Sequence, residues 1–164
     1  MTNDSYKYDS VTVACYIVAS VNNKQLDINM TKLQKLLYIA YGTYLAITGK
    51  RLTNEHPQAW PYGPVFPTTR NKLLKKDLSR IDFSSPLLVQ IKDDAEMKSL
   101  VSLVLNGFGN KNATTLSVWS HQSGSPWDRT VSQEGFTWGA RIPDDYIKEY
   151  FNTIIVRKSN GQRR

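Results

Sequence analysis

The sequence predicts a mainly α fold, a compact single-domain bundle of about five to six helices with a minor short β element. Its 164 residues fit one domain, and 40% hydrophobic with 21% charged residues is ordinary for a globular chain. Apolar residues recur at helical spacing in segments separated by short turns. No repeat, low-complexity tract or linker interrupts them. We therefore expect one domain over residues 1–156, followed by a basic, disordered tail at 157–164.

The first helix is expected from Asp9 or Ser10 to about Val21. Asp9 and Ser10 are favoured N-cap residues because their side chains accept hydrogen bonds from the first free backbone N–H groups. The expected inward positions are Val11, Ala14, Cys15, Val18 and Val21. Several of these residues are β-branched, so burial rather than propensity must stabilise this helix.

The second helix, over 31–50, has the clearest pattern in the chain. Thr31 and Gln34 have the spacing of a capping box, and Gly49 suits a left-handed C-cap. Gly42 lies mid-helix at a cost of about 1 kcal/mol relative to alanine, which predicts close approach of another backbone such as that of the first helix. The apolar stripe is Leu33, Leu36, Leu37, Ala40, Tyr41, Tyr44, Leu45 and Thr48.

The segment after the second helix is predicted to be loop and turn. A third helix can start at Pro64 or Pro67, because proline is tolerated in a first helical turn, and its weak pattern runs to Leu78. The apolar run at 87–91 predicts one short strand or an extended covering segment, and 134–138 is the best candidate to pair with such a strand.

Three further helices are predicted after Asp94, over 113–122 with Asn112 as its cap, and from Pro143. The segment 123–127 reads as a turn that closes on a tryptophan. The buried stripe expected for the helix after Asp94 is Met97, Leu100, Val101, Val104 and Leu105.

Residues for catalysis or metal binding are scarce. A zinc site needs three or four ligands, whereas Cys15, His56 and His121 are far apart in sequence. Cys15 lies on an inward stripe, which favours a buried inert thiol over a nucleophile. His121 with Asp128 would make an acid–base pair, but a hydrogen-bonded histidine holding the 123–127 turn is the favoured interpretation. We expect no enzyme, no metal and no cofactor.

The sequence also bears on the compartment. A single cysteine permits no internal disulfide and fits a reducing environment. No apolar run approaches the roughly 20 residues that cross a bilayer, and the first residues lack the pattern of a signal peptide. We expect a cytoplasmic protein without a membrane partner.

The formal net charge is +7. Apart from the tail, the basic residues gather in one segment, and its candidate polyanion contacts are Arg70, Lys72, Lys75, Lys76 and Arg80. Nucleic acid or an acidic protein surface would fit this cluster, and a solvated helix face is the favoured interpretation. Nucleic-acid binding remains the alternative function.

Aromatic residues concentrate in two turn segments, 58–67 and 123–127. Rigid turns of this kind favour a fixed conformation packed on the 31–50 helix. Tryptophan and tyrosine in such turns anchor protein partners well. The competing interpretation is that Trp60, Tyr62 and Trp127 fill the core.

Taken together, four segments resemble the Panacea domain, also called the SocA-like domain. They are LQKLLYIAYGTYLAITGKRL (33–52), QAWPYGPVFP (58–67), SVWSHQSGSPWDR (117–129) and IPDDYIKEYF (142–151). The resemblance implies a compact, mainly helical antitoxin that binds and neutralises a cognate protein toxin encoded beside it. It implies no enzymatic activity. One family member delivers its toxin to a Clp-type protease, and a homo-oligomer is left open.

The positions that match the family pattern are predicted as fold-signature or partner-binding residues. The principal ones are Leu36, Tyr38, Trp60, Tyr62, Gly63, Pro64, Val65, His121 and Trp127. Leu33, Gln34, Lys35, Pro67 and Pro126 also match. SHQSGSPW is longer than the HQ–GPW form of the family pattern, so the geometry of His121 against Trp127 does not carry over.

Overall fold

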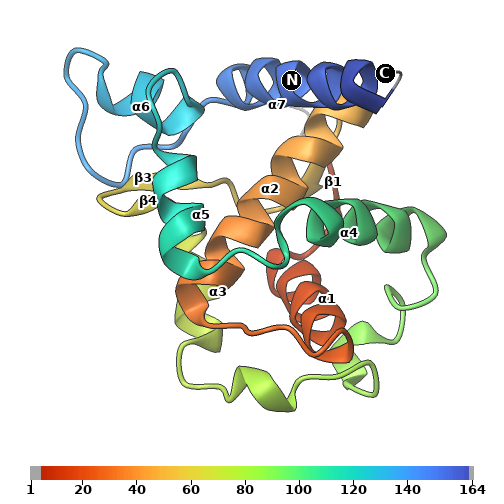
Figure 1. Cartoon of the computed structure of the whole chain (residues 1–164). Coiled ribbons are helices and arrows are strands. Elements are labelled where there is room, and N and C mark those ends of the chain that lie inside the picture. The colour runs from red at the N-terminus through yellow and green to blue at the C-terminus, as the bar shows by residue number, and fades with distance from the viewer. Residues whose placement is uncertain (1–4, 163–164) are drawn as a thin grey trace.

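The computed structural model describes residues 5–162, with side chains up to residue 155, and confirms the mainly α class (Figure 1). The helices are α1 (Ser10–Asn23), α2 (Met30–Thr48), α3 (Pro67–Leu73), α4 (Ala95–Phe108), α5 (Ala113–Ser120), α6 (Pro126–Val131) and α7 (Asp144–Gln162), with short 3-10 turns η1 (Leu78–Arg80) and η2 (Pro86–Leu88). The strands are β1 (Tyr6–Tyr8), β2 (Arg51–Thr53), β3 (Gln58–Trp60) and β4 (Gly63–Val65).

Helix α2 runs diagonally through the centre of the molecule (Figure 1). It packs against α1, α4, α5, α7, β2 and β4, and every residue from Lys32 to Leu45 is buried. A helix with no solvent-exposed face is typical of the interior of a domain. The helix predicted over 31–50 is therefore confirmed, and it forms the centre of the fold.

The caps of α2 follow the prediction at one end only. Gly49 adopts the left-handed conformation, with φ of 71°, as predicted. The N-cap is Asn29, whose side chain accepts from the Lys32 amide at 2.8 Å. The predicted capping box of Thr31 with Gln34 is wrong, because the Gln34 side chain instead accepts from the Phe66 amide at 2.7 Å.

Gly42 is needed for packing against α7 rather than α1. A Cβ at this position would lie 2.3 Å from Cδ2 of Phe151. The Phe151 ring therefore packs directly on the α2 backbone. It also contacts the Tyr38 ring edge-on, with 5.5 Å between the two ring centres. The predicted close approach is confirmed, but its partner is an aromatic side chain and not the first helix.

Helices α1 and α4 form as their sequences predict. Asp9 caps α1 by accepting from the Val11 amide at 2.9 Å, and Asp94 caps α4 by accepting from the Met97 amide at 3.1 Å. Cys15 is buried, as predicted. All five predicted stripe residues of α4 are buried as well.

The predicted strand at 87–91 is wrong. Pro86 starts η2, and the chain then turns so that Leu88 and Ile91 are fully buried while Leu87 and Val89 are exposed. Inward residues three apart fit a helical turn and not a strand. Segment 134–138 forms no strand either.

Within the described residues, the four strands form two short pairs. Strand β1 pairs parallel to β2, and β3 with β4 makes an antiparallel hairpin in which Trp60 faces Gly63. The hairpin edge also holds the chain before α7, through a hydrogen bond of 2.8 Å from the Ala59 amide to the Ala140 carbonyl.

The remaining helices differ from prediction in extent. Helix α3 starts at Pro67 as predicted but ends at Leu73 rather than Leu78, and the Glu55 carboxylate caps it by accepting from the Thr69 amide at 3.0 Å. The predicted turn at 123–127 leads into an additional helix, α6, capped by Ser125. The α7 backbone continues to Gln162, and the side chains of the predicted tail at 157–164 lie outside the described residues.

No helix within residues 5–162 combines the length and hydropathy needed to span a bilayer.

Candidate partner-binding groove

Seven of the predicted residues meet at one groove, which we call the hairpin groove. It lies between the start of α2, the β3–β4 hairpin, α3 and α5, and has a volume of about 830 Å³. Trp60, Tyr62, Val65, Arg70 and His121 line it. Gln34 and Lys35 are the two that come from α2. Most of its lining is apolar, and it is open to solvent on one side.

The hairpin backbone is built for a close approach to α2 and α5. Gly63 has φ of 115°, a conformation that favours glycine. A Cβ there would lie 2.5 Å from the Ser120 hydroxyl and 2.9 Å from Cε of Lys35. Pro64 and Val65 follow as buried residues, so the hairpin rests directly on the two helices.

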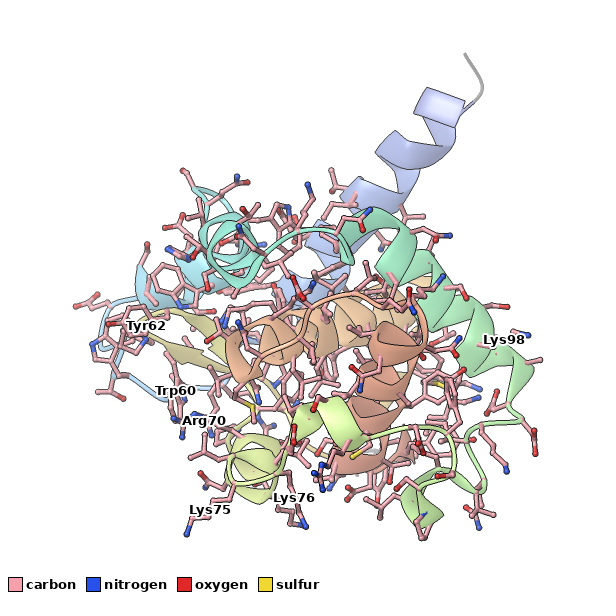
Figure 2. The ribbon with its side chains drawn as sticks, turned by 60° about the horizontal axis from the view of Figure 1, so that its bottom comes forward. Trp60, Tyr62, Arg70, Lys75, Lys76 and Lys98 are labelled. Atoms are coloured by element: carbon pink, nitrogen blue, oxygen red, sulfur yellow. The ribbon has the colours of Figure 1, made fainter. Side chains whose placement is uncertain are left out.

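Trp60 holds the hairpin in place through three contacts. Its indole N–H donates to the Gln58 side chain at 3.1 Å, and the Arg70 guanidinium lies 5.7 Å from its ring centre. Its carbonyl accepts from the Trp127 indole at 2.8 Å. The two aromatic turns therefore meet at this hydrogen bond. Figure 2 shows the side chains of Trp60, Tyr62 and Arg70 on the same side of the molecule.

Tyr62 is the most exposed large hydrophobic residue of the described chain, at 78%. Val118 of α5, on the same groove, is 56% exposed. The proposal that Trp60, Tyr62 and Trp127 all fill the core therefore fails for Tyr62. Trp60 and Trp127 are half-buried.

Leu36 and Tyr38 belong to the core instead. Leu36 is fully buried and Tyr38 is 1% exposed. The Tyr38 hydroxyl has no hydrogen-bond partner within the described residues, and burial raises its pKa well above the ordinary value. These two family-pattern residues are scaffold.

Lys35 is an unexpected buried cation in the lining of the groove. It is 1% exposed, and its ammonium donates to the Pro64 carbonyl at 3.2 Å. Burial lowers its pKa from 10.5 to about 8. Helical periodicity alone did not reveal this lysine, because lysine is normally read as a surface residue.

The His121 ring packs on the second aromatic turn. Its ring centre lies 5.2 Å from that of Trp127, and its Nδ1 is buried without a partner among the described residues. Asp128 accepts from the Gly124 amide at 2.9 Å instead. The predicted hydrogen-bonded histidine is therefore wrong, and no His121–Asp128 pair forms.

The basic segment is not one continuous surface. Arg70 turns toward Trp60, and Arg80 pairs with Asp77 at 3.5 Å. Figure 2 shows Lys75 and Lys76 pointing away from the groove at the end of α3. Lys72 is exposed, so these three lysines stay candidate polyanion contacts.

Candidate metal ligands do not gather in the described part of the chain, where no three His, Cys, Asp or Glu side chains come together.

The fold and the groove define a small, mainly helical domain with an aromatic hairpin beside an open apolar groove. The family described as "Antitoxin SocA-like, Panacea domain" matches residues 33–128, from α2 to α6. The protein "Antitoxin SocA" of Caulobacter vibrioides (strain NA1000 / CB15N) is 30% identical over 165 aligned positions, covering 92% of this chain and 86% of that protein. No solved structure gives a significant match. The chain belongs to the SocA-like antitoxin family of Panacea domains.

Proposed function

We propose that this protein is a cytoplasmic antitoxin that binds and neutralises a cognate protein toxin, and that the toxin contacts the hairpin groove. The exposed Tyr62 beside Trp60 and Arg70, on a hairpin that the family match includes, carries this proposal. The protein acts in this proposal by binding and not by catalysis.

The side chains at the groove are those that dominate protein interfaces. Tryptophan, tyrosine and arginine are enriched among residues whose truncation costs most of the binding energy. Trp60 and Arg70 already contact one another, and the hairpin is fixed by Trp127 and Gly63. A preorganised surface loses little conformational entropy on binding, so more of the contact energy appears as affinity.

Co-expression with the product of the adjacent gene tests this proposal. The wild-type chain should restore growth to cells that express the toxin. Val118→Asp places a charge in the groove and should abolish rescue. Val89→Asp is the matched control, since Val89 is 61% exposed and does not line the groove.

Two results would contradict the proposal in different ways. A wild-type chain that gives no rescue would remove the antitoxin function. Rescue by Val118→Asp at the wild-type level would leave the function standing and exclude the groove as the contact.

Delivery of the toxin to a Clp-type protease is a second step that we propose for neutralisation. The toxin half-life should then shorten when this chain is present, and the shortening should disappear in cells without the protease. An unchanged half-life with full rescue would indicate direct neutralisation. Chromatography with light scattering of the free chain decides whether a homo-oligomer forms.

Nucleic-acid binding is the alternative function, favoured by the exposed Lys72, Lys75 and Lys76. Such binding must weaken steeply as salt rises, because counterions are released from the phosphates. A fluorescence anisotropy titration without binding at about 50 mM salt would exclude it.

A further inference from the structure

We propose that the hairpin groove binds a segment of the partner that places an aspartate or glutamate side chain against Lys35, next to a large apolar side chain in the groove. This inference rests on the proposed function and specifies the chemistry of the partner. Three features of the groove support it.

The first feature is the incomplete set of partners of Lys35. An ammonium group carries three N–H donors. Within the described residues, the Lys35 ammonium has a single hydrogen-bond partner, the Pro64 carbonyl at 3.2 Å. The side chain is 1% exposed, so the other two donors have little contact with bulk solvent, and no described residue supplies an acceptor for them. A carboxylate would supply both acceptors and the opposite charge.

A comparison with Lys32, one turn earlier on α2, separates this lysine from an ordinary buried one. Lys32 is 4% exposed, and its ammonium donates to the Gly109 carbonyl at 2.7 Å. The carboxylate of Asp27 offsets part of the burial cost and acts to raise the pKa of Lys32. Burial is the sole cause that shifts the pKa of Lys35, so no carboxylate of the described chain compensates it.

The second feature is the charge of the groove. Its described lining includes the cations Lys35 and Arg70 and no aspartate or glutamate. An incoming carboxylate therefore meets attraction without a competing acid. His121 adds a buried Nδ1 without a partner on the same lining.

The third feature is the apolar character of the remaining surface. Tyr62 and Val118 expose most of their side chains at the groove. A volume of about 830 Å³ holds more than one side chain. The groove therefore fits an apolar side chain of the partner next to the acidic one, rather than an isolated anion.

A random-peptide library, selected on the wild-type protein and counter-selected on Val118→Asp, tests the inference without the toxin. The groove-dependent peptides should share an aspartate or glutamate near an aromatic or large aliphatic residue. A C-terminally amidated synthetic peptide of that sequence should bind at least about tenfold more tightly than its Glu→Gln partner. Amidation ensures that only the side-chain carboxylate is measured.

The variant Lys35→Met tests whether Lys35 is the group that binds the carboxylate. This variant keeps an unbranched side chain that is one heavy atom shorter and removes the charge, so the Glu and Gln peptides should then bind equally. Lys75→Met removes a lysine that points away from the groove and should keep the wild-type preference. Melting temperatures verify that both variants are folded.

The outcomes separate this inference from the proposed function. Groove-dependent peptides without an acidic residue, or a Lys35→Met protein that still prefers the Glu peptide, would overturn the inference and leave the antitoxin proposal intact. Peptides that bind only with a free C-terminus would overturn it as well. Failure of the wild-type chain to rescue growth would remove the antitoxin proposal, while the peptide affinities would still decide the groove chemistry.

Discussion

Two parts of the same helix show different uses of burial. In the middle of α2, Gly42 lets the Phe151 ring pack on the backbone, and Tyr38 meets that ring edge-on. Near its start, α2 buries Lys35 beneath Gly63 of the hairpin. The middle is apolar packing that stabilises the fold, whereas the start holds a cation at a desolvation cost. Polar groups kept where apolar ones would be more stable point to a functional region.

The largest effect is expected in the middle of the helix. Phe151→Ala removes a ring that is 2% exposed, and it should lower the free energy of unfolding by about 3–5 kcal/mol. Leu103→Ala, at a 46% exposed position of α4, is the control and should change stability by less than about 0.5 kcal/mol. Urea unfolding followed by circular dichroism measures both. Similar losses in the two variants would contradict the assignment of α7 to the core.

Near the start of α2, the prediction concerns the pH dependence of the free energy of unfolding, which Lys35 causes. Burial lowers the pKa of Lys35 from 10.5 to about 8, so between these values the unfolded chain holds a proton that the folded chain has released. The free energy of unfolding then rises with pH, by at most about 1.4 kcal/mol per pH unit. Below about pH 8 the cost of burying the charge is fully present.

Lys35→Met lacks this titration and serves as the reference. It should be more stable than the wild type at about pH 7, and the difference should shrink toward about pH 9.5. Taking the difference between the two proteins cancels the titration of the tyrosines and other groups that they share. A difference that stays constant over this range would show that Lys35 is solvated.

The sequence predicts the helices, but it does not predict the hydrogen bonds that form only when the helices pack against other elements. Residues at helical spacing and side chains such as Asp9 and Asp94 define α1 and α4, because caps and stripes are local properties. The Thr31 capping box fails because Asn29 is an equally good cap and Phe66 needs the Gln34 acceptor. That need arises only once the hairpin packs on α2.

The residues of the candidate site could be predicted from the sequence, but the role of each residue could not. The aromatic turns and the family pattern gave Trp60, Tyr62 and His121. Their exposure could not be read from sequence, because tyrosine is as common inside as at a surface. Lys35 matched the family pattern, but the sequence assigned it no role. Its burial depends on Gly63, which comes to lie next to its side chain only in the folded structure.

A smaller effect is expected where the two aromatic turns meet. Trp127→Phe keeps a ring but removes the N–H that donates to the Trp60 carbonyl, and should cost about 0.5–1.5 kcal/mol. Because that bond positions the hairpin, binding of the toxin should weaken as well. Thermal unfolding and a calorimetric titration measure the two changes. Unaltered binding would show that the hairpin holds its position without Trp127.

The smallest effect on stability, and the sharpest test of the comparison, is expected at Tyr62. Its side chain is 78% exposed, so Tyr62→Ser should change the free energy of unfolding by less than about 0.5 kcal/mol. A hot-spot tyrosine at an interface contributes 2 kcal/mol or more, so the same variant should weaken toxin binding by about thirtyfold or more. Tyr62→Phe keeps the ring and should bind nearly as the wild type. If Tyr62→Ser binds normally, the exposed hairpin is a structural feature of the fold, and the groove loses its main anchor. If Tyr62→Ser is folded and no longer binds the toxin, the groove residue contributes to binding and not to stability. Phe151→Ala, in contrast, should lose binding only because the protein unfolds.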